Sequence, residues 1–332
     1  MTACLAGPIH GGVSEQALEL ASLSILRFSG ADAIAFLQGQ VSNDTRRLAD
    51  GLPLLSAYSS AQGRVVAVLQ LLPHSSGVMA ILPRELAATT LERLRKFVLR
   101  AKVKIEDLSG QYSVAGAHDA SAVEPANLPA SGAAYKEHEG IAVARVPDGG
   151  QSAAPRYWVV RPRENAAAAR GAADGADDAD LAWRLADIRA GMPQVYAATS
   201  EQFVAQMLNL DLLDAISFTK GCYTGQEIIA RTQHLGRIKR RLSRLSLPSG
   251  SWSIGQPLRL ADGRSGRLTE VVRVGERFEA LAVLTLRGAA ATGDTDSGAG
   301  GAGAGAAPAG GGAEEAIAAE ELPLPYRTEA SP

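Results

Sequence analysis

The chain has 332 residues, 46% of them hydrophobic, which is enough for two or three compact units with their own cores. Lys and Arg number 33 against 35 Asp and Glu, so the net charge lies near zero and no overall field attracts polyanions. An acidic partner would therefore have to meet a local basic patch.

The sequence contains two cysteines, Cys4 and Cys222. One disulfide between them is conceivable, but so low a count in a chain of this size is more typical of a reducing compartment. Two thiols cannot supply the four ligands of an ordinary iron–sulfur cluster within one chain. We therefore expect no resident metal, although Cys222 could be a transient cluster ligand.

No targeting signal is recognisable near the N-terminus. The first basic residue is Arg27, so residues 1–12 lack the charged region of a secretory signal and the arginines of a mitochondrial presequence. The longest apolar run, residues 65–73, is interrupted by Gln70 and is too short to span a bilayer. We expect a cytoplasmic protein that does not associate with membranes.

The first half of the chain alternates apolar runs with turn residues, a pattern typical of strands with a few helices. The apolar residues Ile34, Leu37 and Val41 recur on one helical face, and a second helix is expected over residues 85–102. Strands are expected at residues 23–28, 64–72, 77–82, 103–105, 112–115, 141–146 and 157–161.

The second half begins with residues 165–180, which are mostly Ala, Gly and Asp and form a weakly specified helix or loop. Residues 181–189 are expected to be helical and to stop before Gly191 and Pro193. After Arg237, short strands are expected at residues 241–247, 257–260, 265–274 and 278–286, in a small antiparallel barrel or sandwich. A Gly/Ala tract follows, and residues 322–326 could dock back as an edge.

The most informative stretch is residues 218–227, with the sequence FTKGCYTGQE. Gly221 and Gly225 are expected to bracket a tight turn, because only glycine takes a positive φ freely. Thr224 and Glu227 form the T-x-x-E pattern of a capping box, which predicts a helix from this point to about residue 235.

Cys222 would then lie just ahead of a helix N-terminus, with Lys220 two residues away, and both features favour a thiolate. Such a thiol is a candidate nucleophile, redox sensor or transient metal ligand. The alternative is a plain strand-to-helix turn whose cysteine packs as a small hydrophobe, and the residues alone leave both interpretations open. The nearest histidine, His234, is more easily explained as a structural cap than as a general base.

The run KGCYTGQE at residues 220–227, followed by Ala230 and Arg231, resembles the signature of the YgfZ family. These folate-binding proteins are related to the aminomethyltransferase of the glycine cleavage system. Three further stretches agree in the same order: LQGQVSND at 37–44, IRAGMP at 188–193 and FVAQMLNL at 203–210. The anchors span about residues 23–237, and an eight-residue match at fixed spacing is highly specific.

The resemblance implies an α+β protein, with an antiparallel-sheet folate-binding body of aminomethyltransferase type followed by a small C-terminal β-barrel. On this division residues 1–20 are an N-terminal extension and residues 21–237 are the body, in two subdomains with a break near 110–180. Residues 238–287 with 320–328 form the barrel, and residues 288–319 are a flexible Gly/Ala-rich insertion.

The resemblance also implies tetrahydrofolate as the cofactor, in a central channel of the body. Trp183 occupies the place of a tryptophan that lines this channel in relatives, although by residue type alone a core residue is slightly favoured. The other residues assigned to folate binding are Arg189, Asp44, Tyr223, Gln226, Glu227 and Arg231.

Two departures from the transferase relatives argue against aminomethyltransferase activity. The strand after the Gly-rich turn reads GRVVAV at residues 63–68, without the carboxylate that acid–base work would need. Arg189 stands where relatives place a glutamate, and an arginine cannot accept hydrogen bonds from a pterin. Asp44 is a spare carboxylate in the early loop and Asp187 could substitute for the missing pterin anchor, but both are better explained as surface or capping residues.

A cationic cluster follows the signature helix and is either a solvated face or a site that attracts folate polyglutamate or an acidic partner. It comprises Arg231, Arg237, Lys239, Arg240, Arg241 and Arg244. Direct nucleic-acid binding is not expected, because aromatic residues make up only 5% of the chain and no RNA-binding motif is present.

The leading hypothesis is a monomeric accessory protein that binds tetrahydrofolate and helps to assemble or repair clusters in iron–sulfur client enzymes. In relatives these include the methylthiotransferase that modifies tRNA. Cys222 would be the functional thiol, as cluster ligand or sulfur acceptor, and Lys220 would tune its charge. The alternative is a folate-dependent aminomethyltransferase or demethylase, and a weaker one is a pure RNA-binding module.

Overall fold

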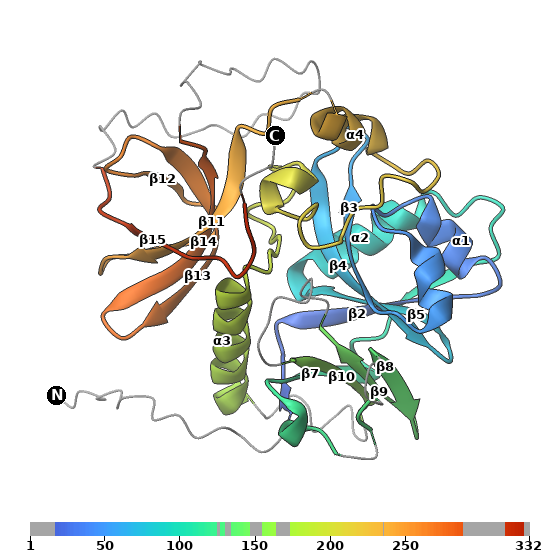
Figure 1. The fold of residues 1–332 in the computed structure, drawn as a ribbon. Helices are drawn as coiled ribbons and strands as arrows, with labels where there is room; N and C mark the ends of the chain where they lie inside the picture. The colour runs from blue at the N-terminus through green and yellow to red at the C-terminus, as the bar shows by residue number, and fades with distance from the viewer. Residues whose placement is uncertain are drawn as a thin grey trace.

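A computed structural model describes residues 17–124, 127–129, 134–146, 155–163, 173–234, 236–287 and 316–328. In these ranges the chain forms three five-stranded antiparallel sheets and four α-helices (Figure 1). This confirms the expected α+β class. The domain boundaries stay a prediction, because most of the N-terminal extension and of the Gly/Ala-rich insertion lies outside the described residues.

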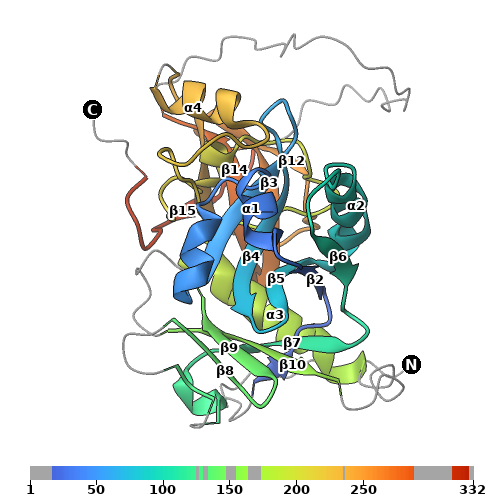
Figure 2. The same ribbon diagram turned by 90° about the vertical axis from the view of Figure 1, so that its right-hand side faces the viewer.

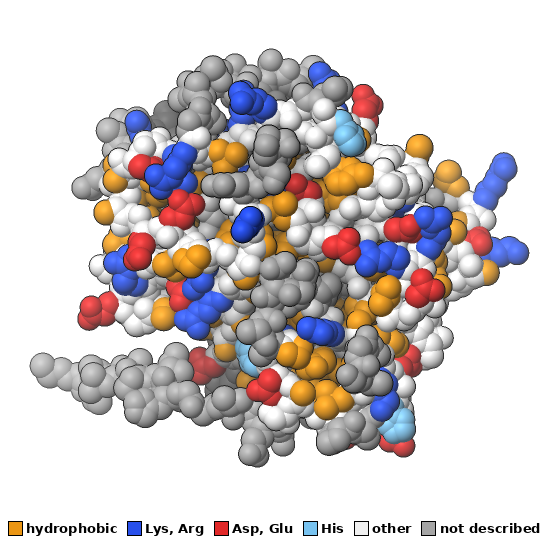
Figure 3. Space-filling model, in the orientation of Figure 1, with side chains coloured by type: hydrophobic (Ala, Val, Ile, Leu, Met, Phe, Trp, Pro, Cys, Tyr) orange, Lys and Arg blue, Asp and Glu red, His pale blue; other side chains and the backbone are white. Residues whose placement is uncertain are grey.

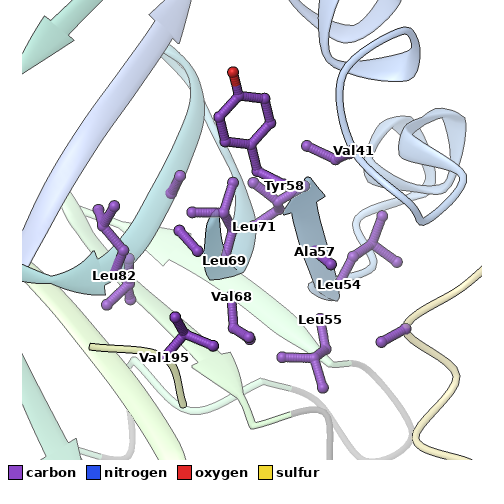
Figure 4. Close-up of a cluster of buried hydrophobic side chains, with 14 of the residues drawn as sticks. Val41, Leu54, Leu55, Ala57, Tyr58, Val68, Leu69, Leu71, Leu82 and Val195 are labelled. Atoms are coloured by element: carbon purple, nitrogen blue, oxygen red, sulfur yellow. The ribbon is translucent and has the colours of Figure 1, made fainter. Parts of the chain in front are cut away.

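The first sheet is built around a long strand that is buried along most of its length. Strand β4 is flanked by β3 and β5, and its apolar side chains pack with those of the neighbouring strands (Figure 4). Gln70 is the one polar residue within the buried part of β4. The strand order is β3 (Leu54–Ser59), β4 (Val65–His74), β5 (Gly77–Pro83), β2 (Leu23–Ser29) and β6 (Lys104–Asp107).

Helices α1 (Ala33–Gln38) and α2 (Arg84–Arg95) belong to this part of the chain, and a 3-10 turn, η1 (Thr45–Asp50), follows α1. The prediction that the second helix continues to residue 102 was wrong. After Arg95 the backbone N–H groups bond three residues back instead of four, as at Phe97 to the carbonyl of Leu94, and the helix tightens into turns.

The second sheet has the order β1 (Leu18–Glu19), β7 (Tyr112–Ala117), β10 (Tyr157–Pro162), β9 (Ile141–Arg145) and β8 (Tyr135–His138). Helix α3 (Ala173–Ala190) stands between the C-terminal sheet and the other two sheets (Figures 1 and 2). The stretch that the sequence left open as helix or loop thus joins the expected helix into one element from Ala173 onward. Trp183 packs flat against Gly116 of β7, where an added Cβ would lie 2.2 Å from the indole ring.

The C-terminal strands form a five-stranded antiparallel sheet, and no closed barrel is detected among the described residues, so the predicted barrel is not confirmed. Its order is β12 (Pro257–Arg259), β13 (Ser265–Val274), β14 (Arg277–Thr285), β11 (Arg240–Leu247) and β15 (Glu320–Leu322). A single bridge between Leu260 and Ile317 links the two edges. The final apolar piece docks as expected, because β15 pairs with β11 and Tyr326 is buried.

One face of this sheet has its own apolar core, and the other packs on the body. Leu268 and Ala282 belong to the sheet's own core, whereas Leu281 belongs to the main core. A bulge in β13 makes Thr269 the extra residue, so Glu270 pairs with Leu281 and lies on the body-facing side. Without the bulge, Glu270 would point into the apolar core of the sheet.

The contact between Trp183 and Gly116 leads to a stability prediction. In Gly116→Ala the new methyl group meets the rigid indole, so we expect a loss of about 1–3 kcal/mol in the free energy of unfolding. Gly110→Ala is the control, because nothing lies within 4 Å of its added Cβ, and its effect should stay within about 0.5 kcal/mol. Urea denaturation measures both; equal midpoints would refute the tight contact.

Candidate functional site

A cavity lies where α3, the first two sheets and the segment after α3 meet. Its volume is about 30 Å³, which holds a few water molecules and is far below the roughly 300–1,000 Å³ of small-molecule pockets. It is lined by Ser22, Leu23, Gln70, Ile81, Trp158, Asp180, Trp183, Arg184, Asp187, Met192, Pro193, Gln194 and Tyr196.

Two tryptophans form one wall of this cavity. The rings of Trp158, from β10, and Trp183, from α3, lie 4.5 Å apart between centroids at 47°. The guanidinium of Arg156 lies 4.7 Å from the centroid of the Trp183 ring, a cation–π contact. Both indoles are buried, so Trp183 is at once a core residue and a cavity residue.

A carboxylate lies beside the tryptophans. Asp187 pairs with Arg156 at 2.7 Å, and burial raises its pKa while the guanidinium lowers it. The interpretation of Asp187 as a surface or capping residue was therefore wrong. It lies one helical turn beyond Trp183 on α3 and lines the same cavity, whereas its role as a substitute pterin anchor stays a prediction.

Three polar atoms of cavity-lining residues have no hydrogen-bond partner among the described residues. They are the acceptor Gln70 Oε1 and the donors Trp158 Nε1 and Trp183 Nε1. Buried polar atoms are normally paired, since an unpaired one costs roughly 1–3 kcal/mol. A ligand with both donors and acceptors on a flat ring would satisfy them.

The signature loop and the early loop form one structural unit. Lys220 Nζ donates to the carbonyl oxygens of Val41 and Asn43, each at 2.7 Å. The backbone N–H of Ser217 donates to the carbonyl of Ser42 at 2.9 Å, which adds a third tie between the loops. The two sequence motifs thus meet because the later loop is hydrogen-bonded onto the earlier one.

The ammonium of Lys220 is buried in this junction, 4.9 Å from the centroid of the Tyr223 ring. Burial lowers its pKa to about 8, although Asp44 opposes the shift. Burial likewise raises the pKa of Tyr223 to about 12. Lys220 therefore has a structural role as the tie between the two motifs, and its effect on the charge of Cys222 stays a prediction.

The signature helix, α4 (Gln226–His234), starts after a glycine with a positive φ. Gly225 has a φ of +81°, and an added Cβ would lie 2.6 Å from the carbonyl oxygen of Ser60 and 3.0 Å from Cα of Gly63. Gly221 has no such constraint, because nothing lies within 4 Å of its Cβ position and its φ is not positive. Of the two bracketing glycines, only Gly225 is required by the geometry.

Cys222 is exposed on this loop and does not line the cavity. Gly63 touches Gly225 of the loop, while the cavity residue Gln70 lies seven positions farther along the chain, mostly on β4. At about 3.3 Å per residue that separation corresponds to roughly 20 Å. Cys222 therefore lies apart from this cavity, and whether its sulfur faces a pterin site stays a prediction.

The other predicted folate residues also lie outside the cavity. Asp44 accepts from the backbone N–H of Arg46 and caps η1, and the hydrogen bond from the Arg46 side chain holds its carboxyl pKa far below the usual range. Arg189 pairs with Glu279 of β14 at 2.7 Å. Tyr223 lies in the loop beside Lys220. The remaining three belong to α4, where Gln226 is half-buried and Glu227 and Arg231 are exposed.

The predicted cationic cluster is divided by the fold. Arg241 is buried in a two-bonded ion pair with Asp211, and Arg244 pairs with Glu279. Arg231, Arg237 and Arg240 are exposed. Figure 3 shows Lys and Arg side chains interspersed with Asp and Glu on the face in view.

Several cavity residues were missed from the sequence. Trp158 and Tyr196 gave no signal, because each belongs to a segment that resembles ordinary core. Gln70 carried a usable signal, since it is the single polar residue in a long apolar run. Glu270 on β13 contacts Arg184 and Tyr196 of the cavity wall, and only the bulge reveals which way it points.

Two further observations on the described residue ranges limit the kind of functional site. No group of three or more His, Cys, Asp or Glu side chains there is arranged to hold a metal ion. Among the helices of those ranges, none has the length and apolar character that crossing a membrane requires.

Comparison with known proteins defines the class. No family model matches the chain. The fold resembles that of the glycine cleavage system aminomethyltransferase T from Bartonella henselae, with a TM-score of 0.55 at 13% identity over 81% of this chain and 78% of that one. The chain therefore has an aminomethyltransferase-like fold.

Relatives at the level of sequence define the family. The tRNA-modifying protein YgfZ of Pectobacterium carotovorum is 32% identical over 257 residues, 75% of this chain and 76% of the relative. The protein of the same name from Colwellia psychrerythraea is 31% identical over 229 residues, 68% of this chain and 69% of the relative. The chain belongs to the YgfZ family of tRNA-modifying proteins, as its motifs indicated.

The buried ammonium of Lys220 gives a pH prediction. Its folded-state pKa of about 8 lies below the ordinary value of 10.5, so unfolding takes up a proton between these values and the stability contribution of Lys220 rises with pH there. We expect the unfolding free energy of the wild type to rise relative to that of Lys220→Met as the pH is raised from 8 to 10.5.

The control for this measurement is Lys96→Met, at an exposed lysine. Urea denaturation at each pH gives the unfolding free energies of wild type and variant. Their difference cancels the titration of groups common to both proteins. A difference for Lys220→Met that stays as flat as that for Lys96→Met would contradict the burial of the ammonium.

Proposed function

We propose that this chain binds tetrahydrofolate in the cavity around Trp183 and supports the assembly or repair of iron–sulfur clusters in client enzymes, a tRNA methylthiotransferase among them. The observation that carries the proposal is a cavity with a two-tryptophan wall, a carboxylate and three unpartnered polar atoms. Membership of a family of tRNA-modifying proteins supports the choice of client.

The donors and acceptors of the cavity suit a pterin. Gln70 Oε1 and the carboxylate of Asp187 accept hydrogen bonds, as the N–H edge of a pterin requires. The indole N–H groups of Trp158 and Trp183 donate, and their rings offer a flat apolar wall. Bound tetrahydrofolate supplies ring amines that carry one-carbon units.

The cavity is too narrow for a ligand of this size, so binding requires its walls to separate. A volume of about 30 Å³ is too small for a pterin. Binding energy from the three unpartnered atoms and from the aromatic wall would offset the cost of this opening.

Cys222 is proposed as the functional thiol, which would meet a partner protein at the surface. It is exposed, and the same surface presents Phe218, whose ring lies 6.0 Å from that of His234. Since the described residues offer no metal-binding group of three, Cys222 would contribute one ligand or accept one sulfur, with the partner supplying the rest. The exposed Arg231, Arg237 and Arg240 would attract an acidic partner surface or the glutamate tail.

Titration with tetrahydrofolate tests the cavity. Bound ligand should quench the fluorescence of Trp158 and Trp183, so we expect quenching in the wild type and its loss, with weaker affinity, in Trp183→Ala. Trp252→Phe is the matched control, because Trp252 belongs to the separate core of the C-terminal sheet and should leave quenching unchanged. A Trp183→Ala protein that binds as tightly as the control would refute the assignment.

Replacement of the thiol tests the second site. In a strain lacking this protein, Cys222→Ser should fail to restore methylthiolation of tRNA, whereas Cys4→Ser should restore it. Because Cys222 lies apart from the cavity, tetrahydrofolate affinity should be the same in both variants. Full complementation by Cys222→Ser would show that the thiol is dispensable.

A folate-dependent aminomethyltransferase or demethylase is the second candidate, and Asp187 is the observation that favours it. A carboxyl with a raised pKa beside the cavity could exchange a proton with a folate amine. Turnover of a methylated amine with tetrahydrofolate that disappears in Asp187→Asn would favour this activity over the accessory role.

A further inference from the structure

A buried carboxylate on the C-terminal sheet is bonded to two parts of the cavity wall. Glu270 Oε1 accepts from Arg184 Nη2 at 2.5 Å and from Arg184 Nε at 3.1 Å. Glu270 Oε2 accepts from the hydroxyl of Tyr196 at 2.5 Å. Arg184 belongs to α3 and Tyr196 to the segment that follows it, and both line the cavity, whereas Glu270 does not.

The position of Glu270 follows from the bulge at Thr269. The extra residue turns Glu270 to the body-facing side of β13, and its own next backbone N–H, that of Val271, donates to Oε1 at 3.0 Å. The carboxylate is therefore fully bonded and 3% exposed. A charged group in such a position holds its partners firmly, since removing it leaves the half-buried guanidinium of Arg184 without its bonded carboxylate.

A second link between α3 and the same sheet does not touch the cavity. Glu279 of β14 pairs with Arg189 of α3 and with Arg244 of β11. None of these three residues lines the cavity. The two links have similar chemistry, and both join α3 to the C-terminal sheet. Comparing them therefore distinguishes a general effect of docking the sheet from an effect on the cavity.

We infer that Glu270 is a positioning residue that latches the cavity in its present narrow form, so that the C-terminal sheet controls access to it. Arg184 and Tyr196 are held together by one carboxylate, with the guanidinium 6.0 Å from the centroid of the tyrosine ring. While these bonds persist the two wall elements cannot separate. Admission of a ligand as large as a pterin, which rests on the proposed function, breaks or rearranges them.

The first experiment needs no ligand. In a Trp252→Phe background the fluorescence reports Trp158 and Trp183, and acrylamide quenching measures their access to solvent. Glu270→Ala should increase the quenching constant severalfold, and Tyr196→Phe and Glu270→Gln, which keeps one acceptor oxygen but loses the charge, should give smaller increases. Glu279→Ala is the matched control and should also stay near the parent.

The second experiment measures tetrahydrofolate association by stopped-flow fluorescence. Loss of the hydroxyl bond in Tyr196→Phe should raise the association rate by up to roughly tenfold, the factor that corresponds to one hydrogen bond of about 1.4 kcal/mol. Tyr196→Phe also keeps the test possible if the Glu270→Ala protein does not fold. Thermal unfolding of each variant checks folding.

The latch is overturned if the quenching constant of Glu270→Ala is no larger than that of Glu279→Ala. If Glu270→Ala does not fold, the latch is overturned when Tyr196→Phe has the same quenching constant as the parent. Absence of tetrahydrofolate binding in every protein would instead reject the proposed function and leave the quenching result to decide the latch. An increase in quenching that is specific to the Glu270 and Tyr196 variants supports it.

Discussion

Helix α3 is the constraint on which the arrangement of the three sheets depends, because each sheet is tied to it by a different kind of contact. Asp180 accepts from the backbone and hydroxyl of Ser22, directly before β2. Trp183 packs on Gly116 of the second sheet at a distance that only glycine allows. Arg184 binds Glu270 of the C-terminal sheet. The cavity forms where these contacts converge, so its walls come from parts of the chain far apart in sequence.

Separation of the thiol from the cavity changes how the two sites can be connected in function. Cys222 lies on a loop that is bonded to the early loop through Lys220, at the opposite end of β4 from Gln70. In the proposed function, a ligand in the cavity and the sulfur of Cys222 would therefore not meet directly. The proposal connects the two sites through a partner protein that binds at Cys222.

The C-terminal sheet has two faces with different tasks, and a one-residue irregularity assigns Glu270 to one of them. The face with Leu268 closes its own core, and the face with Leu281 packs on the body. The bulge at Thr269 moves a carboxylate from the first face, where it would be unpaired in an apolar core, to the second. Bulges of this kind commonly re-aim a side chain near a functional site.

Local sequence determined most strands and the family. Strands such as β2 and β14 follow from apolar runs bounded by turn residues, and the eight-residue run ending at Glu227 is specific without any structure. Short strands escaped detection, among them β1 with two residues, because their pairing partner rather than their composition makes them strands. The short C-terminal strands left barrel and sandwich open, and the family resemblance implied a barrel; whether the edges of such a sheet close is decided by pairing that no strand pattern encodes.

Tertiary structure alone decided where the polar side chains go. Asp187 and Arg241 look like surface charges in the sequence, and both are paired with partners at least 30 residues away. Lys220 lies beside Cys222 in the chain but points to carbonyls of the early loop. The physical reason is that periodicity records which face of an element is apolar, whereas the partner of a buried charge is set by packing between elements that no local pattern encodes.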